Sequence, residues 1–345
     1  MNGTTKKMRY GIGMRTQYPQ GDDMVQRTED QLDQARWADR LGFDSLMKSQ
    51  HLAGYPLQEF QQMPFLARVM GEAPNLRLIT GIVLLSLHKP LDLAEQLATI
   101  DVMSGGRLTF GAGLGYREVE FKGFGTTAKD RVPRFLENLE AIKRLWTEDE
   151  VTMQGSHFEL DHVRVSLKPA QKPTPPIWIG ANADAAIKRA AKLADAWFIN
   201  PHQKMATIAR QLDVYRRALD EAGKPFPTEL PLAREIFIAP SKQAAMDRCG
   251  SYLAEKYKIY HEWGQDKAMP AGDNDLSLAL EELQEDRFLL GPADAIAESL
   301  IAYGRKLSVN HMVLQFHWVG MPQEMVLEQM QMFAEEVMPK VEQGL

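Results

Sequence analysis

Two short stretches combine residue types that could bind a ligand and move protons. Gln50-His51 follows an apolar run, and histidine is the side chain whose ordinary pKa suits acid–base work near neutral pH. Further along, Gly111, Gly113 and Gly115 alternate at the end of a second apolar run and lead into Tyr116. Alternating glycines at a strand end let the backbone approach a flat or phosphorylated ligand closely. The two stretches therefore predict a ligand-binding site with a histidine beside it.

The sequence lacks the patterns of enzymes that work without an organic cofactor. It contains no His-Glu-x-x-His zinc pattern and no Gly-x-Ser-x-Gly nucleophile motif, so no metal site is expected. The single cysteine, Cys249, falls in a predicted helix, which argues against a catalytic thiol. A few histidines and arginines beside glycine-rich loops are typical of a protein that positions a cofactor, and the cofactor then carries the chemistry.

The elements that must position these residues alternate between short apolar runs and amphipathic helices. Eight such runs predict strands: Met8–Met14, Phe43–Met47, Leu78–Leu87, Arg107–Phe110, Ile177–Gly180, Ala196–Ile199, Leu232–Ala239 and Met312–His317. Helices between successive strands predict an α/β fold, a single (β/α)8 TIM barrel over residues 1–345. Two insertions are expected: a β-hairpin at about 151–168, after the fourth helix, and a mobile lid at about 260–288, before the last strand.

An open, doubly wound sheet is the alternative fold. The chain does not begin with a strand-Gly-x-Gly-x-x-Gly-helix unit, and Gly111-Ala-Gly-Leu-Gly115 lacks the last glycine at the required spacing. The segment that follows looks like a charged loop rather than the start of a helix. These departures favour the barrel.

Chemistry in a barrel lies at the carboxyl ends of the strands, which selects candidate residues by position. Arg15 follows the first strand, and His317-Trp318 ends the eighth. We expect Arg15, His317 and Trp318 to contact the substrate. His88 precedes Lys-Pro and is interpreted as an ordinary helix start.

Composition excludes several classes of partner. The 345 residues carry a net charge of −6 without a long basic stripe, so neither nucleic acid nor an anionic membrane is expected as a partner. The longest apolar run, Gly81–Leu87, is too short to span a bilayer, and the polar segment 1–7 lacks the apolar region of a signal peptide. We therefore expect a cytoplasmic protein.

Several blocks along the chain resemble the bacterial luciferase-like flavin oxidoreductases. The most specific block runs from Asp101 to Gly115 and contains Ser-Gly-Gly-Arg followed by the alternating glycines. Gly42-Phe-Asp-Ser with Gln50-His51, Pro176-Ile-Trp-Ile-Gly-Ala-Asn-Ala-Asp-Ala-Ala186 and the ending Phe333-Ala-Glu-Glu-Val-Met-Pro339 are also similar to that family. The resemblance spans nearly the whole chain.

The resemblance implies a barrel enzyme that uses reduced flavin. The favoured reading is a two-component monooxygenase: a separate flavin reductase supplies reduced FMN, and O2 reacts through a C4a-peroxyflavin to oxygenate a small organic substrate. The alternative is an F420-dependent oxidoreductase that transfers hydride. A second alternative is a non-catalytic flavin-binding protein. A homodimer or higher homo-oligomer is also implied.

The resemblance assigns roles to individual residues. His51 matches the catalytic histidine, although Gln50 stands where relatives carry an acidic partner. The flavin phosphate site falls on Gly180, Ala181, Asn182 and Ala183, at the start of a helix. Some relatives add an arginine where this chain has Leu114, so either Arg117 substitutes or the backbone holds the phosphate.

The resemblance implies that the flavin ring lies between Gly81–Ile82 and the glycine-rich stretch Gly111–Tyr116. Gly81–Ile82 matches a non-prolyl cis peptide beneath the ring in many relatives, and Tyr116 matches a tyrosine that lines it. Together with Gly111 and Gly113, these residues complete the expected cofactor site. The segment at about 260–288 corresponds to a lid that shields the flavin from water.

Overall fold

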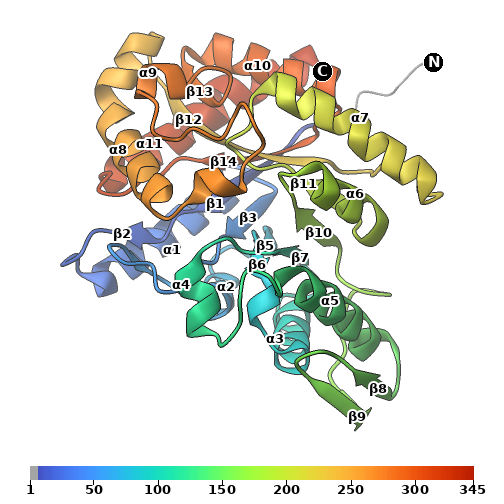
Figure 1. Ribbon diagram of the computed structural model, residues 1–345. Helices are drawn as coiled ribbons and strands as arrows, with labels where there is room; N and C mark the ends of the chain where they lie inside the picture. Colours follow the sequence, from blue (N-terminus) through green and yellow to red (C-terminus); the bar gives the residue numbers. More distant parts are fainter. Residues whose placement is uncertain (1–6) are drawn as a thin grey trace.

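A curled parallel sheet forms the centre of the molecule (Figure 1). The computed structural model describes residues 7–345. Neighbouring strands follow the order β11-β10-β7-β5-β3-β1-β14-β12-β13, and β6 pairs with β7 off this path. The bounds are β1 (Arg9–Met14), β3 (Ser45–Lys48), β5 (Arg77–Thr80), β6 (Val83–Leu84), β7 (Leu108–Gly113), β10 (Ile177–Gly180), β11 (Ala196–Phe198), β12 (Pro231–Ile238), β13 (Phe288–Gly291) and β14 (His311–Gln315).

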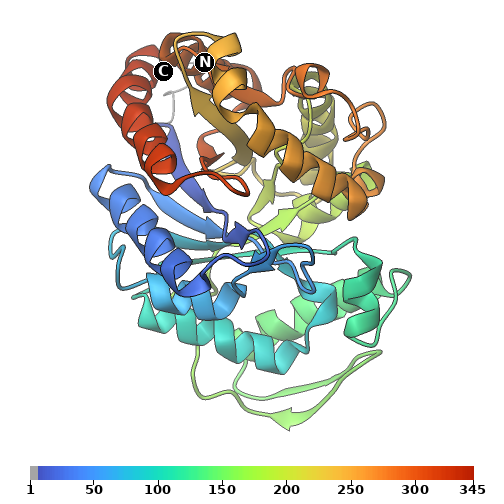
Figure 2. The ribbon, with the colours of Figure 1, turned by 90° about the vertical axis from the view of Figure 1, so that its left-hand side faces the viewer.

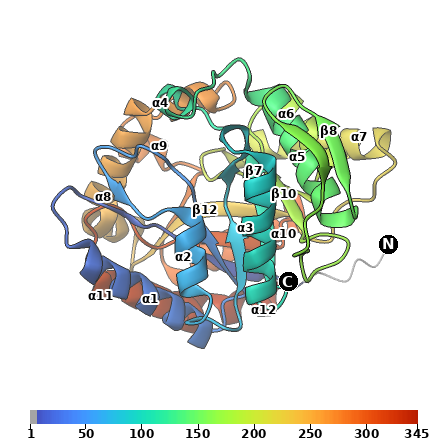
Figure 3. The same cartoon turned by 90° about the horizontal axis from the view of Figure 1, so that it is seen from below.

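The two sides of the curl meet beside β11. Ile199 forms a parallel bridge with Leu232 of β12. The Ile199 N–H donates to the Pro231 carbonyl at 2.9 Å, and the Ile199 carbonyl accepts from Ala233 N–H at 3.1 Å. Seen from below, helices surround the strands (Figure 3). The predicted α/β class is confirmed, and its parallel sheet is curled. Each of the eight predicted runs overlaps a strand of this sheet, and the third run overlaps both β5 and β6.

Helices cover the outside of the sheet because each turns an apolar face toward it. In α5, for example, Phe135, Leu139 and Ile142 recur at helical spacing and are buried. The helices are α1 (Met24–Arg40), α2 (Gln62–Val69), α3 (Pro90–Met103), α4 (Glu118–Gly123), α5 (Arg131–Thr147), α6 (Asp184–Leu193), α7 (Met205–Glu221), α8 (Lys242–Glu262), α9 (Leu280–Leu283), α10 (Ala293–Leu307), α11 (Gln323–Met332) and α12 (Met338–Gly344). A separate small cluster of buried apolar side chains comes from six strands: Met47, Ile79, Trp178, Ala196, Phe198, Ala233 and Val313.

The amino-terminal ends of several strands are joined by a buried polar cluster. The two ring nitrogens of His311 lie 2.7 Å from Ser45 Oγ and 2.7 Å from a Glu229 carboxylate oxygen. Arg77 also binds Glu229. Ser45 and His311 are fully buried, so this triad-like arrangement has no access for a substrate and stabilises the strand starts instead.

The structure departs from the sequence prediction at three places. The predicted third strand, Leu78–Leu87, is broken at Gly81–Ile82 into β5, β6 and a short 3-10 helix, η1 (Leu85–Leu87). A short helix, α4, follows the glycine-rich loop where a charged loop was predicted. The predicted lid begins inside α8, and it also contains η2 (Gln265–Ala268), α9 and the first residue of the extra strand β13.

The predicted hairpin is present and stands apart from the main sheet. β8 (Val151–Gln154) and β9 (Glu159–Val163) pair antiparallel and project from the rest of the molecule (Figures 1 and 2). A second small antiparallel pair joins β2 (Gln17–Tyr18) to β4 (Gln58–Glu59). Within residues 7–345, no helix is long and apolar enough to cross a membrane. We expected no signal peptide because residues 1–7 are polar. Residues 1–6 of that segment lie outside the described residues.

Glycines in β7 allow the broken strand to pack against it. The Thr80 hydroxyl donates to the Gly111 carbonyl at 2.9 Å and accepts from the Gly111 N–H at 2.8 Å. A Cβ at Gly111 would overlap the Thr80 carbonyl oxygen, and a Cβ at Gly113 would overlap the Ile82 side chain. Both glycines therefore serve the close approach of two strands.

We predict that Gly111→Ala lowers the free energy of unfolding by about 1–3 kcal/mol, because the new methyl group meets backbone that cannot move aside. Gly123→Ala is the matched control, since a Cβ there meets nothing within 4 Å and Gly123 ends a helix. The control should change stability by less than about 0.5 kcal/mol. Urea denaturation measures both variants, and equal stability of the two would contradict the packing role of Gly111.

Candidate active site

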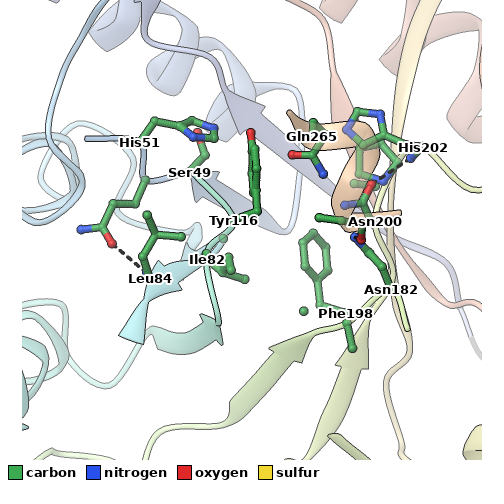
Figure 4. A pocket seen from close by; sticks show the side chains of 18 of the residues that line it. Ser49, His51, Ile82, Leu84, Tyr116, Asn182, Phe198, Asn200, His202 and Gln265 are labelled. Atoms are coloured by element: carbon green, nitrogen blue, oxygen red, sulfur yellow. Dashed lines mark hydrogen bonds between the residues drawn. The ribbon is translucent and has the colours of Figure 1, made fainter. Parts of the chain in front are cut away.

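A cavity of about 250 Å³ opens at the carboxyl ends of the strands. Its lining comes from segments far apart in the chain, from Gly13 within β1 to Gln315 at the end of β14. Figure 4 shows Ser49, His51 and Ile82 on one side of the cavity and Phe198, Asn200 and His202 on the other. Nine of the predicted site residues line it, and so does Gly115 of the glycine-rich loop: Arg15, His51, Gly81, Ile82, Tyr116, Gly180, Ala181, Asn182 and Ala183.

One wall of the cavity is largely backbone. The Gly81–Ile82 peptide is cis, as the sequence comparison with the flavin family predicted. Met47 packs directly under Gly81, where a Cβ would overlap its sulfur. The side-chain oxygen of Gln50 accepts a hydrogen bond from Leu84 N–H at 2.8 Å and so fixes the backbone of β6, which follows the cis peptide. This wall can therefore accept a flat group at close range.

The amino terminus of α6 forms a second wall. Gly180–Ala183 precede this helix, and the residue at its N-cap, Ala183, makes no side-chain capping hydrogen bond. The first amide groups of a helix have no partner within the helix, and the helix dipole adds positive potential there. Asn182 is held in place, because its side chain donates to the Ala268 carbonyl at 3.0 Å and its carbonyl accepts from Gln211 at 2.6 Å. An uncapped helix terminus in a cavity suits an anionic oxygen group.

His51 is a neutral imidazole at the cavity edge. Burial lowers the pKa of His51 to about 4. Its Nε2 lies 3.3 Å from the Tyr260 hydroxyl, and its ring packs 5.2 Å from that of Trp263. Nδ1 is buried without a hydrogen-bond partner, and so is the hydroxyl of Tyr116. Both unsatisfied atoms belong to residues that line the cavity, where a polar ligand could satisfy them.

Arg15 belongs to a buried polar network that reading the sequence did not predict. Its guanidinium donates to Gln315 at 2.9 Å and to the Tyr260 hydroxyl at 2.6 Å, and it lies 3.4 Å from a Glu235 oxygen. Lys256 forms a close ion pair with the same Glu235 oxygen. Tyr260 is thus the link between Arg15 and His51, so a change at Arg15 can reach His51 through one hydroxyl group.

Glu59 is the carboxylate near His51, and reading the sequence also missed it. Gln50, which replaces the acidic partner of relatives, binds Leu84 instead of His51. Glu59 forms a buried ion pair with Lys48 at 2.7 Å and accepts from Gln17 at 2.9 Å. Glu59 opposes the downward shift of the His51 pKa, but burial outweighs it. The pairing of β2 with β4 brings Glu59 into place, and a two-residue strand leaves no periodic signal in a sequence.

Four positional predictions are corrected by the structure. His317 and Trp318 do not line the cavity: the His317 ring is 2.7 Å from the Arg15 carbonyl, and the indole N–H of Trp318 donates to Glu235 at 2.6 Å. Both instead support the Arg15 network. Gly111 and Gly113 are also absent from the lining, because the group that they approach is the neighbouring strand.

Arg117 does not take the place of the missing phosphate arginine. Its guanidinium donates to the carbonyls of Leu52 and Ala53, pairs with Glu120 and lies 4.0 Å from the Trp263 ring centre. These contacts hold it away from the cavity lining.

Comparison with known proteins identifies relatives of two kinds. The crystal structure of monooxygenase RslO1 from Streptomyces bottropensis is similar with a TM-score of 0.81 and 26% identity, covering 96% of this chain and 99% of that chain. The FMNH2-dependent dimethylsulfone monooxygenase of Pseudomonas putida is 27% identical over 188 residues, which are 53% of this chain and 52% of the relative. The F420-dependent glucose-6-phosphate dehydrogenase of Nakamurella multipartita is 25% identical over 314 residues, or 88% of this chain and 90% of the relative.

The family match covers almost all of the described chain. Residues 8–331 match the luciferase-like monooxygenase family. That range contains every residue that lines the cavity, from Gly13 to Gln315. The chain belongs to the luciferase-like monooxygenase family.

Proposed function

We propose that this protein is a monooxygenase that uses reduced FMN and O2 to oxygenate a small organic substrate. The observation that carries the proposal is one cavity with both a flat backbone wall at Gly81–Ile82 and an uncapped helix terminus at Gly180–Ala183. A flavin mononucleotide needs both surfaces, one for its ring and one for its phosphate. The monooxygenase relatives support the choice of reaction. The proposal also takes the curled sheet as a (β/α)8 barrel, for which the Ile199–Leu232 bridge is the support.

The residues of the cavity fit this cofactor. The backbone amides at Gly180–Ala183 would hold the phosphate, and Gly81 and Ile82 would lie against the ring. The unsatisfied Nδ1 of His51 and hydroxyl of Tyr116 would bind polar atoms of cofactor or substrate. When bound and reduced, FMN supplies the electrons that activate O2. A separate flavin reductase would provide the reduced FMN.

The side chains of the protein have three tasks in this proposal. The neutral His51 binds a polar group through Nδ1, the ring nitrogen that does not contact Tyr260, and so holds a proton beside the cavity. Tyr260 near the end of α8 and Gln265 and Ala268 of η2 also line the cavity, and they belong to the segment at about 260–288 that we take to be the lid that excludes water. Met47 and Thr80 keep the backbone wall in place.

An F420-dependent oxidoreductase is the second candidate. The Nakamurella relative aligns with 88% of this chain, a larger share than the FMNH2-dependent relative does. The helix terminus at Gly180–Ala183 suits any phosphate, so it does not separate the two cofactors. Direct measurement of the binding of each cofactor separates the two candidates.

For the cofactor, we predict that the purified protein binds FMNH2, and binds it more tightly than reduced F420. Anaerobic titration with each cofactor, followed by tryptophan fluorescence, measures both affinities under the same conditions. Tight F420 binding with no binding of FMNH2 would overturn the monooxygenase proposal in favour of the second candidate.

A separate prediction concerns the phosphate. Ala183→Asp should weaken FMN binding by at least about tenfold, because the new carboxylate caps α6 and repels phosphate at the same amides. Riboflavin, which lacks the phosphate, serves as the matched ligand and should bind with an affinity changed less than about threefold. The cap should also leave the variant at least as stable as the parent. An equal loss for both ligands would place the phosphate elsewhere.

A further inference from the structure

The cavity lining carries charge of one sign, and that sign is positive. Among the lining residues, all of which lie in the described part of the chain, Arg15 is the one with a permanent charge, and none is a carboxylate. Two histidines also line the cavity, but burial keeps them neutral: it lowers the pKa of His51 to about 4 and that of His202 well below its usual range. A ligand in this cavity therefore meets one positive group and no negative one.

The positive charge of Arg15 is only partly balanced by its surroundings. Glu235 is its carboxylate partner, yet the same oxygen is in closer contact with Lys256, and the other oxygen accepts from Trp318. Burial and the adjacent Arg15 charge lower the pKa of the Lys256 ammonium to about 7. When Lys256 is protonated, two cations share one buried carboxylate. A buried excess of charge is unfavourable unless a counter-charge arrives.

Arg15 has donors left for a ligand. A guanidinium carries five N–H groups. Three contacts engage its nitrogens: Nε donates to Gln315, Nη1 to the Tyr260 hydroxyl, and Nη2 lies 3.4 Å from Glu235. Two N–H groups remain, one on each terminal nitrogen, and Arg15 lines the cavity. A planar fork of this kind matches a carboxylate or another oxyanion.

The position of Arg15 separates it from the proposed phosphate site. Arg15 follows β1, whereas Gly180–Ala183 begin at the last residue of β10. In the strand order, β7, β5 and β3 lie between β10 and β1 on one side. On the other side lie β11, β12 and β14, joined by the Ile199–Leu232 bridge. Three strands on either path place Arg15 across the cavity from the phosphate site and beyond the Gly81–Ile82 wall after β5. The space beside Arg15 is thus left for the substrate.

We propose that the substrate carries an anionic oxygen group, a carboxylate or a comparable oxyanion, and that Arg15 binds it at the side of the cavity opposite the phosphate site. This inference rests on the proposed function and names the substrate class of the same cavity. The lining also carries apolar side chains, Met47, Ile82, Leu84 and Phe198, so the substrate has a hydrocarbon part beside its anionic group.

Matched pairs of carboxylates and their neutral amides test the proposal. The probes are benzoate with benzamide and octanoate with octanamide, titrated by calorimetry into the full-length protein without flavin. At least one carboxylate should bind at least about tenfold more tightly than its amide. Arg15→Gln should remove that preference, and Arg15→Lys, which keeps the charge without the fork, should retain part of it.

A second variant controls for the possibility that Arg15→Gln loses its preference because the fold is damaged. Gln315→Glu is nearly isosteric, keeps an oxygen that accepts from Arg15 and cancels the excess charge. It should abolish the carboxylate preference as Arg15→Gln does. Arg248→Gln, whose arginine pairs with Glu328 at the surface, should leave all four affinities unchanged.

The outcomes separate this inference from the proposed cofactor. FMN is titrated into the same variants, and its affinity should change less than about threefold in Arg15→Gln. Equal affinity within both probe pairs, or no binding of either carboxylate, overturns the anionic substrate class. A loss of FMN affinity in Arg15→Gln with an unchanged carboxylate preference would assign Arg15 to the cofactor instead, and would leave the flavin proposal standing.

Discussion

The close contact between Thr80 and Gly111 is the constraint on which the cavity depends. At this point β5 stops, and the Thr80 hydroxyl replaces the strand-to-strand ladder by bonding both the N–H and the carbonyl of Gly111. Because glycine leaves room for the Thr80 carbonyl, the chain can turn into the Gly81–Ile82 peptide without separating from β7. A side chain at residue 111 would push the two strands apart, and the flat wall of the cavity would be lost.

The opposite side of the cavity is built on a different principle. There, charged side chains are buried together, and each is held by several partners: Arg15 by Gln315 and Tyr260, and Glu235 by Lys256 and Trp318. Such a network is costly to bury and is stable only when nearly all of its groups are paired. Three members of this network, Arg15, Tyr260 and Gln315, line the cavity. One wall can therefore accept a planar ring, and the other carries the positive charge of Arg15, which can bind an anionic ligand.

Much of the fold could be predicted from the sequence because its signals are local. Apolar runs such as Ile177–Gly180 and amphipathic helices such as α5 are visible within a few residues. The cis peptide at Gly81–Ile82 was predicted from family resemblance and is present, and Gly180–Ala183, predicted in the same way to bind phosphate, line the cavity. The ion pairs of Glu235 and Glu59 could not be predicted, because each joins residues on separate elements and a charged residue in a sequence reads as surface.

The errors at the strand ends have a physical cause as well. Position after a strand indicates which end of the sheet a residue occupies, but it does not say which way the side chain turns. At the end of β14, Gln315 lines the cavity, while His317 and Trp318 turn toward Arg15 and Glu235. A crystal structure of the protein with FMN tests the central claim most directly. The account predicts phosphate at the amides of Gly180–Ala183 and the ring against Gly81–Ile82; phosphate bound beside Arg15, or a flavin outside the cavity, would contradict it.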